Sequence, residues 1–212
     1  MSTSWRSETQ PDPVYISRSG WGLIVLRFLL LAVLVFSGLL VLLTLRLIER
    51  PLFGLRRPIT PFVTQFVCRN SFRFMGIGFR TTGDLMHERG AVVANHSSWL
   101  DIFALNARKR IYFVSKTEVA KWPGIGWLAK ATGTVFIERN PRKAREQTLL
   151  FEQRLKADHK LVFFPEGTRS RTGELKNFKK GAFRLAQELQ LPVLPVAIHG
   201  TKNVLPSDTV DL

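Results

Sequence analysis

The fold of this chain is decided by the stretch AVVANHSSWLD, residues 91–101. It begins as a continuous apolar run, passes through a polar turn, and leads into apolar residues at helical spacing. The stretch LVFFPEGTRS, residues 161–170, repeats the apolar run and the turn ahead of another helical pattern. Strands that are apolar throughout are typical of a parallel sheet covered on both faces. The repetition therefore predicts an α/β fold with a largely parallel mixed sheet flanked by helices.

The same alternation continues along the chain, and it predicts one α/β domain over residues 76–212. Short apolar runs predict strands, and apolar residues recurring every three or four positions predict helices. The predicted strands are 72–80, 91–95, 111–115, 134–138, 161–164 and 193–198, and the predicted helices are 98–107, 142–155 and 178–189. No internal repeat or low-complexity segment interrupts this pattern.

Residues 21–46 are predicted to form a transmembrane or membrane-embedded helix. Residues 23–45 carry only one charge, Arg27, and as a helix they would be about 35 Å long, enough to cross the hydrocarbon core. A cleaved signal peptide is the weaker alternative, because the apolar run is long and no small-x-small cleavage site precedes Arg46. More arginines follow this helix than precede it, which places the C-terminal domain on the cytoplasmic side.

Two further segments flank the predicted membrane helix. Residues 1–20 are polar and are expected to form a loose tail. Residues 47–75 read as a linker followed by a helical pattern over 61–73. Arg69 and Arg73 argue against a second crossing. The helix therefore either lies in the membrane interface or packs on the domain core as an ordinary helix, and the sequence favours neither.

The composition narrows the possible partners. Lys and Arg number 31 against 16 Asp and Glu, for a formal net charge of +15, which points to a polyanionic partner such as an anionic membrane, a phosphate ligand, an acidic protein or nucleic acid. The single cysteine, Cys68, excludes an intramolecular disulfide and any multi-cysteine zinc site. Nucleic acid is the least favoured partner, because the aromatic residues are not interleaved with the basic runs.

Unusual polar side chains follow four of the predicted strands. They are His96, Lys116, Arg139, and the pair Glu166 and Arg169. In an open parallel α/β sheet, ligands bind beyond the carboxyl ends of the strands. Four separate segments thus deliver a base, a carboxylate and three cations to one edge, which predicts a single site for an anionic ligand.

His96 and Asp101 form the first candidate catalytic pair. An imidazole takes a proton from a hydroxyl when a carboxylate fixes its tautomer and stabilises the resulting cation. Five positions is not a same-face helical spacing, so the pair requires His96 in the loop and Asp101 in the first helical turn. The alternative is structural, because Ser98-x-x-Asp101 also has the form of a capping box.

The turn FPEGTR, residues 164–169, is the second candidate. Pro165 ends the strand, Gly167 permits positive φ or the close approach of a ligand, and Arg169 can bind a phosphate in bidentate fashion. The competing interpretation is a solvated loop with an incidental Glu–Arg pair.

Together these motifs resemble the glycerolipid acyltransferases related to bacterial 1-acyl-sn-glycerol-3-phosphate acyltransferase. His96-x4-Asp101 is similar to their first block, GTVFIER (133–139) to the second, FPEGTRS (164–170) to the third and VLPVA (193–197) to the fourth. Lys116 lies in a segment that resembles the one between the first two blocks. The resemblance covers roughly residues 70–200, and the order of the blocks makes it specific.

The resemblance implies transfer of a fatty acyl group from a thioester, on coenzyme A or acyl carrier protein, to a lipid hydroxyl. His96 would be the general base and Asp101 would orient and charge it. Arg139, Arg169 and Lys116 would hold the acceptor's phosphate, and Glu166 would fix the glycerol region. Gly167 and Thr168 would belong to the same substrate site. The family uses no metal or cofactor, and it implies a bacterial inner-membrane location.

Three matters stay open at this stage. The preferred acceptor is 1-acyl-sn-glycerol 3-phosphate, which would give phosphatidate, but the motifs also suit another lyso-lipid, such as a lyso-ornithine lipid, or glycerol 3-phosphate. A non-enzymatic, membrane-anchored basic module would explain the charge and the anchor but not a His and a Glu at strand ends. The chain ends at Leu212, whereas family members usually continue; if the chain is truncated, the strand over 193–198 is expected to have an unpaired edge.

Overall fold

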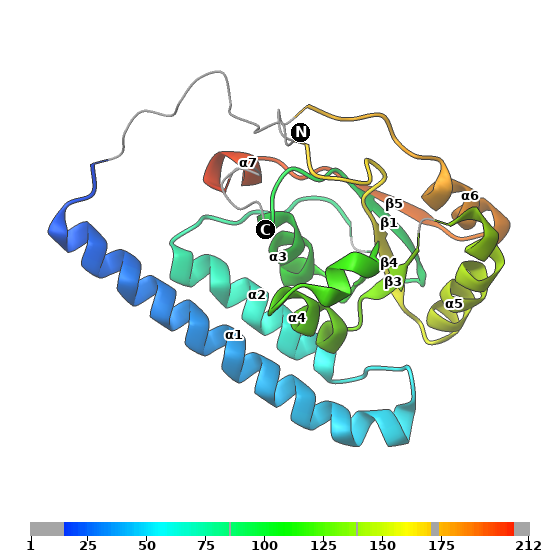
Figure 1. The fold of residues 1–212 in the computed structure, drawn as a ribbon, viewed down its shortest axis with the longest axis horizontal. Helices are drawn as coiled ribbons and strands as arrows, with labels where there is room; N and C mark the ends of the chain where they lie inside the picture. The colour runs from blue at the N-terminus through cyan, green and yellow to red at the C-terminus, as the bar shows by residue number, and fades with distance from the viewer. Residues whose placement is uncertain (1–14, 85, 139, 171–173, 206–212) are drawn as a thin grey trace.

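A five-stranded sheet forms the centre of the molecule (Figure 1). The computed structural model describes residues 15–84, 86–138, 140–170 and 174–205. The strands are β1 (Gly90–Ala94), β2 (Tyr112–Lys116), β3 (Val135–Ile137), β4 (Lys160–Phe163) and β5 (Val193–Val196), in the order β3-β2-β4-β1-β5. All ladders between these described strands are parallel, which confirms the predicted α/β fold.

The central strands are buried on both faces, as their continuous apolar runs predict. Val92 of β1 pairs with Val162 of β4 on one side and with Leu194 of β5 on the other. Both valines are fully buried. Successive parallel strands need crossover connections. Helix α3 (Leu100–Arg108) links β1 to β2, α5 (Ala144–Lys156) links β3 to β4 and α6 (Gly181–Glu188) links β4 to β5, while residues 117–132 link the neighbours β2 and β3.

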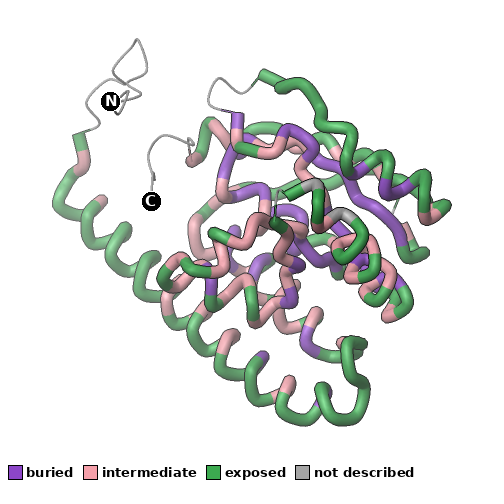
Figure 2. Tube along the Cα trace, turned by 45° about the vertical axis from the view of Figure 1, so that its right-hand side comes forward, coloured by how far each residue is buried: buried purple, intermediate pink, exposed green. Residues whose placement is uncertain are grey.

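Helices cover the two faces of the sheet in separate groups. On one face, Leu105 of α3 packs with Val92 and Phe113, and α2 (Thr60–Met75) in turn packs on α3. On the other face, residues of α5 and α6 pack against β2, β3 and β4 through Phe151 and Leu185. Figure 2 shows the buried segments gathered in and around the sheet.

The long helix α1 (Arg18–Phe53) runs antiparallel beside α2, and the two form what we call the α1–α2 hairpin (Figure 1). A β-carbon added at Gly38 would overlap the Val67 side chain, so glycine permits the close approach of the two helices. By length and composition, α1 could cross a membrane: its most apolar 18-residue window has a mean hydropathy of 2.9, and only 6% of that window is buried.

The turn of the hairpin is fixed by one buried carboxylate. Glu49, which is 2% exposed, accepts hydrogen bonds from the backbone N–H groups of Ile59 at 2.6 Å and Thr60 at 2.9 Å and from the Thr60 hydroxyl at 2.7 Å. Arg46 lies 3.4 Å from the same carboxylate. The Glu49 cluster, meaning Glu49, Arg46, Ile59 and Thr60, therefore closes the turn and satisfies the amino end of α2.

Two further contacts tie this turn to the α/β domain. Arg57 donates a hydrogen bond to the carbonyl of Ala131 at 2.6 Å, close to the end of α4 (Ile125–Thr132). His159, directly before β4, bonds the carbonyl of Leu55 through Nε2 at 3.0 Å and stacks on Tyr112 at 3.7 Å between ring centroids. These contacts fix the position of the hairpin relative to the sheet.

The structure corrects the prediction of a strand over 72–80. Phe72 lies in α2, which continues to Met75 because Cys68 and Phe72 pack together against α3. Gly76, with φ +72°, ends the helix, and residues 77–82 have no regular structure. The helix predicted over 61–73 is confirmed; one face of it packs on α3, while Phe62 and Phe66 are exposed.

Four short elements were missed by the sequence patterns. Two are the helices α4 and α7 (Thr201–Val204), and two are the 3-10 turns η1 (Thr117–Lys121) and η2 (Pro141–Lys143). Each is shorter than the window over which a helical period is recognisable. Both α4 and α7 contribute to the site described next.

Candidate active site

His96 stands at the carboxyl end of β1, where the chain turns into α3. Its Nδ1 lies 2.8 Å from Oδ2 of Asp101. The ring stacks on Phe164 with centroids 4.0 Å apart and planes 15° from parallel. The side chain is 14% exposed and lines a cavity. The predicted pairing of a loop histidine with an aspartate in the first helical turn is therefore present in the structure.

Asp101 is fully buried and accepts four hydrogen bonds. Besides His96, Oδ2 accepts from the backbone N–H groups of Ser97 at 2.7 Å and Ser98 at 2.9 Å, while Oδ1 accepts from the Thr201 hydroxyl at 2.6 Å. Burial by itself would raise the pKa of this carboxyl, but these hydrogen bonds outweigh burial and lower the pKa below its ordinary value. Asp101 is therefore an anion at neutral pH.

The capping alternative for Asp101 turns out to be half realised. Asp101 accepts from the Ser98 backbone N–H, as in a capping box, but the Ser98 hydroxyl accepts from Leu100 at 3.2 Å and donates to the carbonyl of Leu205 at 2.6 Å. One carboxylate thus fixes the start of α3 and the imidazole together.

Thr201 is a site residue that the sequence patterns did not reveal. It begins α7, directly after Gly200, which has φ +81°. Two neighbouring contacts hold the same C-terminal segment on the loop that carries His96: Asn95 exchanges hydrogen bonds with the backbone of Ile198 at 2.9 and 2.7 Å, and Ser98 bonds Leu205. The residues after β5 therefore contact Oδ1 of Asp101, while His96 contacts Oδ2.

Glu166 is buried, with 4% exposure, and both of its oxygens are engaged by backbone groups. Oε1 accepts from the N–H of His96 at 2.8 Å and Oε2 from the N–H of Lys176 at 3.1 Å. The backbone N–H of Ser170 also donates to the carbonyl of His96 at 2.7 Å. The turn after β4 thus grips the backbone of the histidine itself. Contact of Glu166 with an acceptor stays a prediction.

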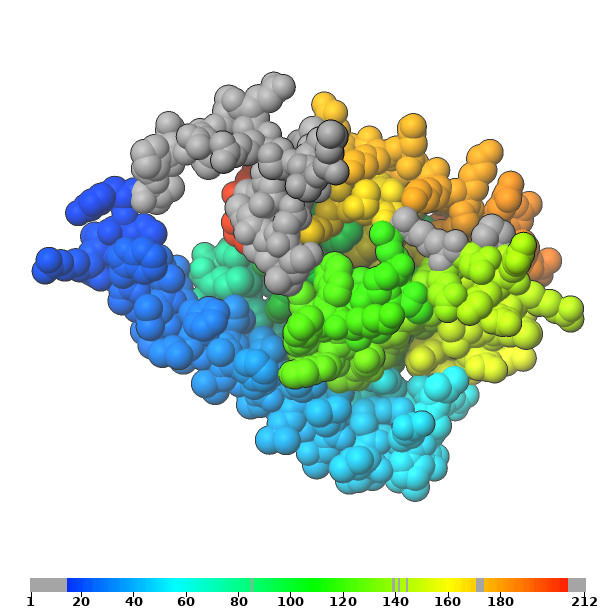
Figure 3. Space-filling view, viewed as in Figure 1, coloured from blue at the N-terminus to red at the C-terminus, as the bar shows by residue number. Residues whose placement is uncertain are grey.

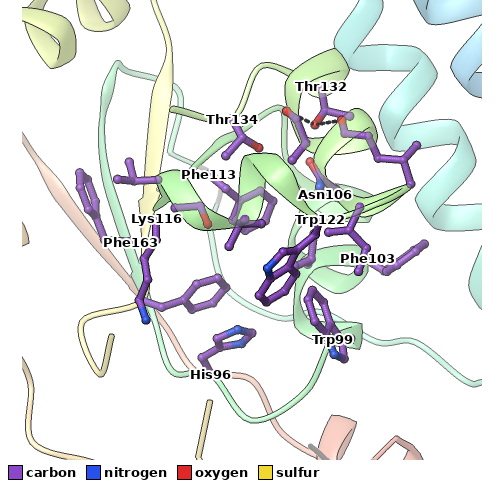
Figure 4. Close-up of a pocket in the computed structure, with 18 of the residues that line it drawn as sticks. His96, Trp99, Phe103, Asn106, Phe113, Lys116, Trp122, Thr132, Thr134 and Phe163 are labelled. Atoms are coloured by element: carbon purple, nitrogen blue, oxygen red, sulfur yellow. Dashed lines mark hydrogen bonds between the residues drawn. The ribbon is translucent and has the colours of Figure 1, made fainter. Parts of the chain in front are cut away.

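A largely apolar cavity of about 680 Å³ opens beside His96 (Figure 4). Both the α1–α2 hairpin and the α/β domain contribute to its walls. The lining residues include Leu39 and Leu42 of α1, Val63 and Val67 of α2, Phe103 of α3 and Leu128 of α4. In Figure 4, His96 lies near Trp99 and Trp122 at one end, and Thr132 and Thr134 lie at the other. The contribution of α1 and α2 to this cavity was not foreseen from the sequence.

The predicted binding residues gather at the same edge, with one outside the described residues. Lys116 ends β2 and lines the cavity, as do Gly167, with φ +73°, and Thr168. The Arg169 guanidinium also lines it and lies 4.7 Å over the Trp99 ring. Arg139 lies outside the described residues. Among the residues that the structure describes, no cluster of three or more His, Cys, Asp or Glu side chains could hold a metal ion.

Comparison with known proteins agrees with this geometry. A family model described as Acyltransferase matches residues 78–199. The chain belongs to the acyltransferase family. A lyso-ornithine lipid O-acyltransferase of Rhodobacter capsulatus is 48% identical over 84% of this chain and 65% of its own length. A chloroplastic 1-acyl-sn-glycerol-3-phosphate acyltransferase of Brassica napus is 39% identical over 54% of this chain and 34% of its own.

A solved structure extends the likeness to the fold. The crystal structure of PlsC, the 1-acyl-sn-glycerophosphate acyltransferase of Thermotoga maritima, superposes with a TM-score of 0.70 and 28% identity, covering 88% of this chain and 77% of that one. This chain spans about a third to two thirds of the length of the two curated relatives named above.

The acyltransferase match and the site do not coincide completely. The match at 78–199 includes His96, Asp101 and Glu166. Thr201 and the parts of α1 and α2 that line the cavity lie outside it. Those outer parts complete the surroundings of the His96–Asp101 pair that the family match contains.

Proposed function

We propose that this chain moves a fatty acyl group from an acyl thioester to the hydroxyl of a lyso-ornithine lipid at a membrane surface. The observation that carries the chemistry is the His96–Asp101 pair at the end of an apolar cavity. The observation that favours this acceptor is the 48% identity to the Rhodobacter capsulatus lyso-ornithine lipid O-acyltransferase over 84% of this chain. The lysophosphatidate acceptor preferred from the motifs has weaker support.

His96 is suited to act as general base through its Nε2 atom. Because Asp101 is an anion that can only accept at Oδ2, Nδ1 of His96 carries the proton in the 2.8 Å bond. Nε2 is then unprotonated. It takes the proton of the acceptor hydroxyl as the oxygen attacks the thioester carbonyl carbon, and Asp101 stabilises the imidazolium.

Collapse of the tetrahedral intermediate completes the transfer. The carbon–sulfur bond breaks, the new ester bond remains, and the proton held on His96 passes to the departing thiolate. The histidine returns to its neutral state, so one residue serves as base and then as acid. The two backbone contacts from Glu166 and Ser170 keep the imidazole in place through both steps.

The apolar cavity is suited to the fatty acyl chain of the donor or the acceptor. A lining of Leu, Val and Phe side chains releases water when it encloses a hydrocarbon chain, and about 680 Å³ lies within the usual range for ligand pockets. Since α1 and α2 form part of the cavity wall, the fatty acyl chain would lie between the α/β domain and the membrane-associated hairpin.

Arg169 is suited to the acceptor headgroup in either reading. An ornithine headgroup carries a carboxylate, which a guanidinium binds with the same paired geometry as a phosphate. Lys116, Gly167, Thr168 and Arg139 are proposed for the same headgroup site. The proposal includes a bacterial inner-membrane location with the α/β domain on the cytoplasmic side, which the apolar helix α1 and the arginines after it support.

A second candidate acceptor is 1-acyl-sn-glycerol 3-phosphate. It is favoured by the likeness to the Thermotoga maritima PlsC fold and the Brassica napus acyltransferase, whose names specify that acceptor. The chemistry at His96 would be unchanged, because in both lipids the group that accepts the acyl chain is a hydroxyl.

The test compares acceptors on the protein in detergent micelles, with labelled acyl-CoA and acyl carrier protein as donors. Lyso-ornithine lipid and lysophosphatidate are supplied separately and in competition, with wild type beside His96→Ala. We expect higher kcat/KM for lyso-ornithine lipid and a loss of at least about 10²-fold in the variant. Preference for lysophosphatidate would transfer the proposal to the second acceptor. Equal activity of the two proteins would refute the role of His96.

A further inference from the structure

A second apolar surface borders the active-site cavity, on α6 and the segment before it. Leu175, Phe178 and Phe183 are 69%, 46% and 40% exposed, and the two phenylalanine rings lie 6.3 Å apart. Lys179, Lys180 and Arg184 are exposed among them. We call these six residues the 175–184 surface. Exposed aromatic side chains ringed by charges are typical of protein-binding surfaces.

This surface lies on the other side of the sheet from the α1–α2 hairpin. α6 packs through Leu185 onto the face that α5 also covers, whereas α2 and α3 cover the opposite face. Figure 1 places α6 at the far end of the molecule from α1, and Figure 3 shows the orange residues at the rim away from the blue helix. A membrane that holds the hairpin therefore leaves this surface facing water.

The charge of the surface is positive and unpaired. Over residues 174–188 there are four cationic side chains against two carboxylates, Glu174 and Glu188. Among the described residues, no carboxylate pairs with Lys179, Lys180 or Arg184. An acidic partner would gain these contacts without displacing an existing ion pair.

The surface is continuous with the catalytic cavity. Lys179 lines the same cavity as His96, together with Gly181 and Ala182 at the start of α6. The backbone N–H of Lys179 also donates to the carbonyl of Pro165 at 2.8 Å, in the turn that carries Glu166. A protein bound here could feed a thioester arm into the cavity without approaching from the membrane side.

We propose that the 175–184 surface docks an acidic acyl carrier protein that presents the acyl thioester, an inference that rests on the proposed acyltransferase function. Such a donor is a small anionic protein with its acyl chain on a long flexible arm. It matches both the cations and the exposed phenylalanines. Coenzyme A would use cations for its phosphates but has no use for two phenylalanines that lie outside the cavity lining.

The test separates the two donors kinetically. Lys180→Glu/Arg184→Glu reverses two charges that do not line the cavity, and Arg89→Glu/Lys156→Glu is the matched control. Arg89 and Lys156 are exposed residues that precede β1 and β4, at the opposite edge of the sheet. With acyl carrier protein as donor, we expect the first variant to raise KM about tenfold, with kcat within about twofold and a weaker salt dependence.

The controls decide what this result means. With acyl-CoA of the same chain length, the KM of Lys180→Glu/Arg184→Glu should change less than about threefold, and the control variant should match wild type with both donors. Equal losses with both donors, an equal loss in the control variant, or a wild type that uses only acyl-CoA would overturn the docking proposal.

A binding measurement keeps the proposal separate from the reaction. Immobilised holo acyl carrier protein should bind wild type and the control variant, and should bind Phe183→Ser and Lys180→Glu/Arg184→Glu at least about fivefold more weakly. This pattern would support docking even if neither lyso-lipid were acylated, in which case only the proposed reaction would fail. Equal binding by all four proteins would overturn the docking surface whatever the activity.

Discussion

Two buried carboxylates organise this molecule, and they differ in what they leave open. Asp101 and Glu49 are 0% and 2% exposed, and each is contacted by four donors. At Glu49 the donors are two backbone groups, a hydroxyl and Arg46, all within the hairpin turn. At Asp101 one donor is the imidazole of His96, which lines the cavity.

The difference teaches how one physical arrangement serves two purposes. A buried carboxylate is stable only when its lone pairs are satisfied. Where all the donors keep their protons at neutral pH, the result is a rigid joint. Where one donor is a histidine facing a cavity, the same satisfied carboxylate fixes a base in one tautomer. We therefore expect mutation at Asp101 to lower turnover and mutation at Glu49 to lower stability.

Asp101→Asn should produce the largest effect, on turnover. An amide in place of the carboxylate no longer enforces the Nδ1–H tautomer or stabilises the imidazolium, so we expect kcat to fall by about 10³ to 10⁴. The measurement is acyl transfer at saturating donor, with circular dichroism to show that the variant is folded. A folded variant whose kcat falls less than tenfold would show that Asp101 does not have this role in catalysis.

Glu49→Gln should affect stability instead. The neutral side chain removes the carboxylate that pairs with Arg46 and presents a donor where the turn supplies only donors, which should cost about 3–5 kcal/mol of folding free energy. Thermal unfolding in detergent would show the loss. The kcat of the protein that remains folded should be close to wild type, and a primary loss in kcat would break the contrast between the two carboxylates.

His159, which links the turn of the α1–α2 hairpin to β4, should make the stability of the protein depend on pH. Burial, with the nearby Arg154, lowers the pKa of this histidine to about 4, against about 6.5 when unfolded. Between these values the unfolded chain binds a proton that the native chain does not. Stability should therefore fall by about 3 kcal/mol as the pH drops from 6.5 toward 4, and then level off.

His159→Phe tests this directly, because the ring can keep its stacking on Tyr112 while losing the titration and the bond to Leu55. The variant should be less stable than wild type at pH 7.5, yet its unfolding temperature should vary less between pH 6.5 and 4. Parallel pH profiles for the two proteins would show that His159 does not titrate as its burial requires.

Thr201→Val should have the smallest effect, and it tests whether the C-terminal segment positions the catalytic pair. Loss of one buried hydrogen bond to Asp101 should lower kcat about tenfold, with KM little changed. It should also shift the acidic limb of the kcat–pH profile, because the carboxylate loses a stabilising donor. Thr201→Ser should restore both, and failure of that rescue would assign the loss to packing instead.

Much of the sheet and the contact between His96 and Asp101 could be predicted because both are encoded locally. Continuous apolar runs identified the strands at 91–95 and 161–164, and the five-residue spacing placed His96 in a loop beside Asp101. The prediction of a strand over 72–80 was wrong because an apolar residue such as Phe72 fits a strand and a helix equally well. Only the packing of α2 against α3 distinguishes the two.

The position of the candidate site could be predicted from the sequence, but its hydrogen-bond network could not. The sequence placed Glu166 at the same edge as His96, as the structure does. It gave no indication that both carboxylate oxygens are occupied by backbone N–H groups, because those donors lie 70 residues upstream and 10 downstream. Nearly every residue has the same backbone N–H group, so a sequence motif cannot show which of these groups will donate to Glu166.

The sequence by itself determined the parallel sheet, the long apolar helix, the pairing of His96 with Asp101 and the cationic character of the edge. These follow from periodicity, short spacings and charge, which act within a few residues. Only the tertiary structure decided that Thr201 completes the Asp101 network, 100 positions away, and that α1 and α2 wall the cavity. Such contacts depend on how the packed layers bring distant segments together, and no local pattern carries that information.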